Sequence, residues 1–144
     1  MQQYLWLIFA LLSAAAASLV GIFGKVGLKD LDANTATAIR AVIMAVFLFA
    51  VVAIQGKLGE IPAIISNKRG ITFICLSGIA GATSWLFYFL ALKFGKVSQV
   101  APVDKLSVVI SIILAVLFLG EKLNVMNGLG TVLITAGVIM VALA

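Results

Sequence analysis

Long uncharged stretches constrain this chain more than any other feature of its sequence. Residues Tyr4–Gly24 and Leu123–Ala144 run for 21 and 22 residues without one Asp, Glu, Lys or Arg. As a helix rising about 1.5 Å per residue, either stretch would be about 31–33 Å long, enough to cross a hydrocarbon core of about 30 Å. We therefore expect an all-α integral membrane protein.

The remaining composition narrows the classes of site and partner. The chain of 144 residues has no His and one Cys, so we expect no metal site, no cofactor and no intrachain disulfide. Cys75 lies in an apolar stretch, where a packed and unreactive thiol is expected. The net charge of +5 comes from basic residues scattered over several connections. Lys and Arg flanking membrane spans explain this charge better than a nucleic-acid partner does.

Five spans are predicted, in one domain that covers residues 1–144. Three follow directly from apolar length, whereas the second and fourth reach spanning length only when they include charged residues. The second then contains Arg40, and the fourth contains Asp104 and Lys105. No connection is long enough to hold a soluble domain. The predicted spans are residues 4–24, 34–54, 71–92, 98–120 and 123–144.

The charges inside the second and fourth spans have two interpretations. Both spans start on the same side, so Arg40 and Asp104 would lie at about the same depth, where an ion pair would hold either charge in the bilayer. Alternatively, Pro102 marks the first turn of a helix whose positive dipole end suits Asp104. Arg40 and Lys105 would then extend to the lipid headgroups.

The basic residues give no clear orientation. With five alternating spans, four lie on each side of the membrane. The chain either inserts both ways and pairs as an antiparallel homodimer, or another factor sets one orientation. Two oppositely inserted copies would form a ten-helix inverted-repeat assembly, an architecture that secondary transporters use. The two sets are Lys57, Lys68, Arg69 and Lys122, and Lys25, Lys29, Lys93 and Lys96.

Small and aromatic residues indicate candidate contact faces. Gly130, Ile134 and Gly137 share one face of the last span, which favours a subunit contact or ordinary packing within the chain. Trp85 and Tyr88 are three residues apart and project from one face of the third span. They are interpreted either as an apolar, cation-binding wall for a substrate or as lipid-facing or core residues.

From about Trp85 to its end, the chain resembles the EamA-type repeat of the drug/metabolite transporter superfamily. Arg40, early in the second span, also matches the Arg that this family carries there. The resemblance rests on four stretches: Ala91-Leu92-Lys93-Phe94-Gly95, Ala101-Pro102-Val103-Asp104-Lys105-Leu106-Ser107, Phe118-Leu119-Gly120-Glu121-Lys122-Leu123, and Gly130-Thr131-Val132-Leu133-Ile134-Thr135-Ala136-Gly137-Val138.

This resemblance implies five helices per repeat and alternating-access transport of small organic molecules. Typical members fuse two repeats, so a single repeat implies a partner, either a second copy or a paralogous half. A cavity lined by the first, third and fourth spans is implied, which includes Trp85, Tyr88, Pro102 and Asp104. The expected protein is a secondary transporter for a small metabolite or amphipathic compound, multi-pass in the inner (plasma) membrane.

The predicted substrate-binding set is completed by Lys105 and Arg40, which would set the charge of the vestibule, while Asp104 would gate the site or carry a proton. A different class of function stays open, a non-transporting membrane subunit that stabilises another complex. An enzyme is not expected, because the sequence offers no His, no paired acids and no nucleophile with a base at a suitable spacing.

Overall fold

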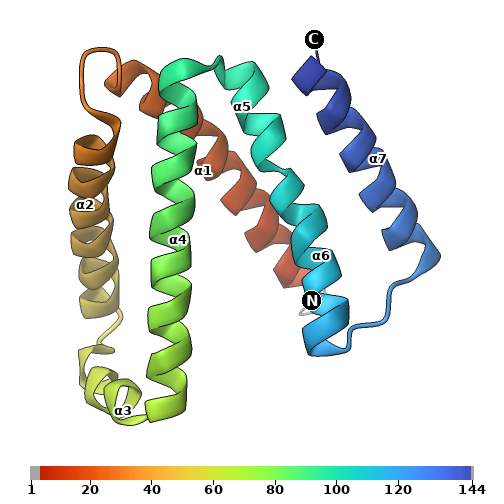
Figure 1. Cartoon of the computed structure of the whole chain (residues 1–144). Helices are drawn as coiled ribbons and strands as arrows, with labels where there is room; N and C mark the ends of the chain where they lie inside the picture. The colour runs from red at the N-terminus through yellow and green to blue at the C-terminus, as the bar shows by residue number, and fades with distance from the viewer. Residues whose placement is uncertain (1–3, 144) are drawn as a thin grey trace. The chain divides into compact units, whose positions relative to one another are not determined.

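The computed structural model describes residues 4–143 and is helical throughout its regular structure (Figure 1). This confirms the all-α membrane fold with five helices long and apolar enough to span a bilayer. The predicted limits at residues 1 and 144 lie outside the described residues. The helices are α1 (Leu5–Gly27), α2 (Ala33–Ile54), α3 (Ile61–Ser66), α4 (Lys68–Phe94), α5 (Val97–Asp104), α6 (Leu106–Leu119) and α7 (Val125–Leu143), with a 3₁₀ turn, η2, at Leu58–Glu60.

Helix ends follow local chemistry. Asp32 caps α2, because its carboxylate accepts hydrogen bonds from the Thr35 amide at 2.8 Å and the Thr35 hydroxyl at 2.9 Å. Asn67 does the same for α4, accepting from the Gly70 amide at 2.9 Å. α6 ends at Gly120, whose φ of 67° is left-handed and suits glycine. These ends separate the apolar runs into distinct helices.

Two features depart from the simplest interpretation of the sequence. The connection between the second and third spans is not irregular, because it contains η2 and α3, whose first turn holds Pro62. The fourth span is divided into α5 and α6 at Lys105. The alternative that placed Pro102 in a first helical turn is wrong, since Pro102 lies inside α5.

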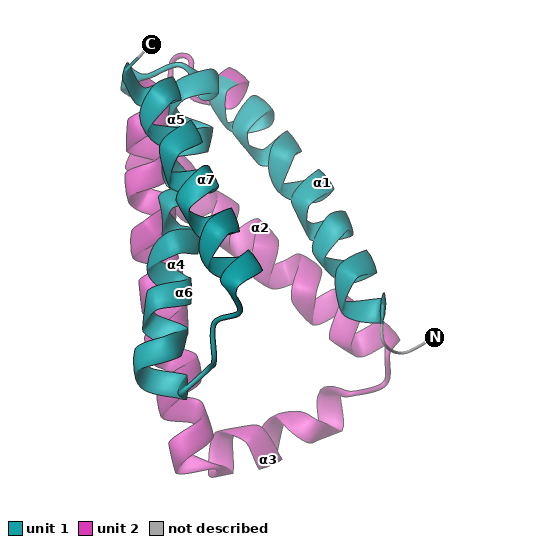
Figure 2. Cartoon of the chain, turned by 90° about the vertical axis from the view of Figure 1, so that its right-hand side faces the viewer, with its two compact units in different colours: residues 1–25, 94–144 teal, residues 26–93 magenta. Residues whose placement is uncertain are grey.

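The described chain divides into two compact units (Figure 2). One contains residues 1–25 and 94–144, in which α7 packs against α5 and α6. The other contains residues 26–93, in which α2 and α4 line a common groove. The predicted single domain stays a prediction.

Apolar side chains cover the helix surfaces in both units. Phe47, Phe87 and Leu117 are 66%, 68% and 71% exposed. In water such surfaces would aggregate, whereas in a bilayer they contact lipid or another helix. The hydroxyls of Thr83 and Thr131 donate to carbonyls one turn back, at 2.8 Å each, and so are satisfied without water.

Candidate functional site

A groove of about 560 Å³ runs between α2 and α4. Its size falls within the range of small-molecule sites. Apart from Thr37 and Arg40, the residues that line it are apolar or glycine, and the Thr37 hydroxyl already donates to the Ala33 carbonyl at 2.7 Å. The lining residues are Thr37, Ala38, Arg40, Ala41, Met44, Ala45, Leu48, Gly78, Gly81, Ala82, Trp85 and Leu86.

Arg40 lies over an aromatic surface of α4. Its Cζ atom is 3.7 Å from the centroid of the Trp85 ring and 5.1 Å from that of Phe89. A guanidinium at this distance from an indole face is attracted by the negative face of the ring. The attraction offsets part of the penalty for a charge in a membrane span, which is about 2.5–3.5 kcal/mol at a helix centre.

Trp85, Tyr88 and Phe89 form one aromatic cluster on α4. The Trp85 and Tyr88 rings meet edge to face, with centroids 5.6 Å apart at 85°. Phe89 is 6.0 Å from Trp85 and 6.1 Å from Tyr88, and it is buried. Contacts between aromatic rings have preferred geometries, so they fix the orientation of the rings more than apolar burial alone would. The cluster therefore presents Trp85 to Arg40 in a defined orientation.

The division between α5 and α6 brings a second set of predicted residues together. Pro102 has no N–H to donate to the carbonyl one turn back, and the Lys105 amide bonds to the Pro102 carbonyl at 3.0 Å, a tighter 3₁₀ pattern. At this point the Lys105 Nζ pairs with the Asp104 carboxylate at 3.4 Å. The predicted residues Pro102, Asp104 and Lys105 thus surround a break in a spanning helix.

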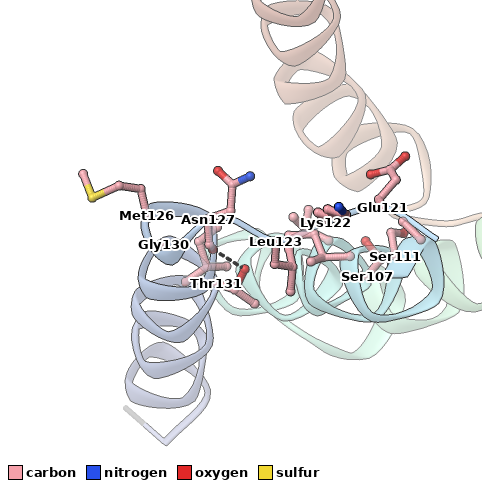
Figure 3. A pocket seen from close by; sticks show the side chains of 13 residues that line it. Ser107, Ser111, Glu121, Lys122, Leu123, Met126, Asn127, Gly130 and Thr131 are labelled. Carbon is pink, nitrogen blue, oxygen red and sulfur yellow. Dashed lines mark hydrogen bonds between the residues drawn. The ribbon is translucent and has the colours of Figure 1, made fainter. Parts of the chain in front are cut away.

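A second groove, of about 580 Å³, lies between α6 and α7 (Figure 3). Ser107 and Ser111 come to it from α6, and Gly130 and Thr131 from α7. Ile134 also lines this groove, whereas Gly137 is not among its lining residues. A Cβ added at Gly130 or Gly137 would meet nothing within 4 Å. The predicted role of this face in subunit or helix packing stays a prediction.

The structure joins some of the predicted site residues and not others. Arg40, Trp85 and Tyr88 belong to the same unit, and Pro102, Asp104 and Lys105 to the other. The ion pair between Arg40 and Asp104 would cross between the units and stays a prediction.

Sequence reasoning missed Phe89 and the contact between Arg40 and Trp85. The positions of the two residues along their helices could have indicated this contact. Arg40 lies about 10 Å along the axis from the start of α2, and Trp85 about 13 Å from the end of α4. Consecutive antiparallel spans place such residues at similar levels.

The sequence pattern of the EamA-like transporter family matches residues 4–143, almost the whole chain. The chain belongs to the EamA-like transporter family. It is therefore a multi-pass membrane protein from a family of transporters, with the lipid bilayer and a small-molecule substrate as its partners.

Two relatives bear on this EamA-like chain. A Sinorhizobium protein named as an uncharacterized transporter in the cobO 3′ region is 48% identical over 140 residues, covering 95% of this chain and 96% of that protein. An uncharacterized protein of Methanocaldococcus jannaschii is 31% identical over 81 residues, covering 56% of this chain and 59% of that protein. No solved structure matches the chain.

Proposed function

We propose that this EamA-like chain is a secondary transporter that moves a small organic metabolite or amphipathic compound by alternating access. The observation that carries the proposal is the placement of Arg40 over Trp85 in a mostly apolar groove between two candidate spans. An ionisable side chain inside a membrane span is costly, and substrate or ion pathways are the usual reason for its presence. Trp85 and Tyr88 would contact the body of the substrate.

The break in the fourth span supplies the second part of the proposal. Discontinuous helices in secondary transporters leave backbone groups available where substrate or ion binds. Pro102 would maintain the break, and the pair of Asp104 and Lys105 would change partners as the site opens to either side. In this role Asp104 carries a proton or acts as a gate.

We further propose that the transporter is an antiparallel homodimer in the inner (plasma) membrane. Basic residues near the ends of the spans are balanced four to four between the two sides. The acidic residues of the connections are balanced as well, with Asp30 and Asp32 on one side and Glu60 and Glu121 on the other. Five spans place the two ends of the bundle on opposite sides, so two opposed copies generate an inverted repeat. The Sinorhizobium relative aligns with this chain over 96% of its own length.

A tolerance screen tests the transport proposal without knowledge of the substrate. Cells that express this chain alone are exposed to panels of small amphipathic anions, cations and neutral compounds. We expect altered tolerance to at least one class, lost in Arg40→Gln and retained in Gly128→Leu. Gly128 lies on α7, lines neither groove described above, and has open space for an added Cβ.

Accumulation of the selected compound in proteoliposomes would then confirm transport. The proposal would be overturned if no class changed tolerance. A foreign membrane protein that co-purifies in stoichiometric amount, without any ligand response, would instead favour the non-transporting subunit.

A further inference from the structure

The groove between α2 and α4 contains a positive charge that no acidic lining residue neutralises. Arg40 is the one charged residue among its lining residues, and none of them is acidic. The acidic residues of residues 26–93 are Asp30, Asp32 and Glu60, all outside α2 and α4. Asp32 lies about 12 Å along the helix axis from Arg40 and is engaged in capping α2. The groove therefore contains a cation but no carboxylate of its own unit.

The contact with Trp85 leaves the N–H donors of the Arg40 guanidinium available to a ligand. With Cζ 3.7 Å from the ring centroid, the planar guanidinium lies over the indole ring. The N–H donors are at the edge of that plane, in a fork that matches a carboxylate or phosphate. Stacking also restricts the side chain, so that less freedom is lost when an anion binds. Arg40 thus has N–H donors for an anionic acceptor and no carboxylate beside it among the residues that line the groove.

The remainder of the groove suits an apolar body. Both helices line the groove with small residues, which leave room between them, and Met44, Leu48 and Leu86 supply apolar contacts. The small residues are Ala41 and Ala45 on α2 and Gly78, Gly81 and Ala82 on α4. A Cβ added at Gly78 or Gly81 would meet nothing within 4 Å, so the space beside these glycines is open. A chain or ring could lie along this surface with its charged end at Arg40.

We propose that the groove between α2 and α4 binds an amphipathic organic anion, with its carboxylate, sulfonate or phosphate group on Arg40 and its apolar body along Gly78 and Gly81. This inference rests on the proposed function, for which it names the substrate class. A cationic ligand is disfavoured because it would meet Arg40 with no acid nearby. The groove, at about 560 Å³, matches a free small molecule better than a whole phospholipid.

Fluorescence quenching can test this binding directly. The chain has two tryptophans, so Trp6→Phe leaves Trp85 as the reporter. The protein is placed in nanodiscs of zwitterionic lipid and titrated with three probes that share an undecyl chain brominated at its third carbon, close to the head group, and end in a sulfonate, a hydroxyl or a trimethylammonium group. Bromine quenches indole fluorescence at short range, so quenching reports occupancy beside Trp85. Each titration is expressed per mole of lipid to correct for partitioning.

We expect saturable quenching by the sulfonate, with an affinity about tenfold to a hundredfold above that of the other probes. Arg40→Gln should remove this preference. Gly81→Leu should weaken sulfonate binding by about tenfold or more, because its Cβ enters open space at the groove and the larger side chain takes up room there. Gly128→Leu, the same change at another open glycine, should leave binding unchanged.

Three results would overturn the inference. The first is equal quenching by all three probes, and the second is a sulfonate preference that survives in Arg40→Gln. The third concerns lipid as the occupant. Stronger quenching by brominated phosphatidylglycerol than by brominated phosphatidylcholine, lost in Arg40→Gln, would assign the site to a lipid headgroup.

The two proposals fail in different ways. Sulfonate binding without any change of tolerance in cells would refute transport and leave the anion site in place. Altered tolerance to cations alone, together with equal quenching by the three probes, would support transport and refute the anion site.

Discussion

The Nζ atom of Lys25 donates a 2.9 Å hydrogen bond to the backbone carbonyl oxygen of Gly95, 70 residues further along the chain. The bond joins the end of α1 to the short connection before α5, and both residues belong to the same unit. Lysines near the ends of spans are usually explained by their effect on orientation. Lys25 has a structural contact in addition, so stability and orientation can be separated by mutation.

Lys25→Met should destabilise the protein, because it leaves the Gly95 carbonyl without this charged donor. We expect a loss of about 0.5–2 kcal/mol, seen as a lower midpoint of thermal unfolding in detergent. Lys29→Met is the matched control, since Lys29 is exposed and lies in the turn that directly follows α1. It removes the same charge and should leave the midpoint unchanged. Equal midpoints for the two variants would show that the bond contributes nothing.

Arg40→Leu should raise stability while abolishing activity. The variant removes a charge that the bilayer disfavours, and the apolar side chain still packs on Trp85. We expect an increase of several degrees in the unfolding midpoint together with loss of the tolerance phenotype. Arg40→Lys keeps the charge without the planar fork and should retain little activity. A lower midpoint in Arg40→Leu would indicate that Arg40 acts chiefly as a structural residue.

Pro102→Ala should join α5 and α6 into a straighter helix. The new amide can bond to the carbonyl one turn back, and the removal of an interior proline is worth about 3 kcal/mol of helix stability. We expect slower hydrogen exchange at the amides of Lys105 and Leu106, together with reduced activity. Val103→Ala, in the same turn, serves as control. Unchanged exchange in Pro102→Ala would assign the break to the charged pair instead.

Asp32 should make the start of α2 sensitive to acid. Hydrogen bonds from the Thr35 amide and hydroxyl hold the pKa of this carboxyl below its ordinary value. A lowered folded pKa means that the stabilisation is complete above about pH 4 and is lost as the pH falls through the folded pKa. Exchange at the first amides of α2 should therefore rise, relative to intrinsic rates, as the pH falls below about 4. Asp32→Asn keeps a capping oxygen and should abolish this dependence, whereas its persistence would implicate another group.

The sequence could predict the helices because each depends on local properties. The uncharged length of Tyr4–Gly24 is sufficient by itself to indicate α1, whatever the rest of the chain does. The break at Lys105 was harder to predict. The sequence around Pro102 suits a proline in the first turn of a helix as well as one inside a helix, and only the position of the helix start distinguishes them. Helix α3 was missed because a six-residue helix leaves too short a periodic signal.

The candidate site could be predicted only in part. Arg40 and Trp85 were found separately, as a charge and an aromatic residue within apolar spans. Their contact depends on which faces of α2 and α4 meet, and helices that are apolar on all sides carry little information about this. Phe89 was missed for the same reason. In a membrane protein, the helix face at a binding site and the face toward lipid are both built from apolar residues. Residue type therefore does not distinguish the two faces.

Antiparallel pairing of two copies is the central claim for this protein, and the orientation of the C-terminus tests it most directly. Cells that express this chain alone would carry a C-terminal reporter active only in the cytoplasm or one active only outside it. The balance of basic residues predicts comparable signals from both reporters. Lys122→Gln with Lys57→Gln, which removes two basic residues from one side, should shift the signal toward a single orientation. Signal from one reporter alone in the unmodified chain would contradict self-pairing and with it the proposed homodimer.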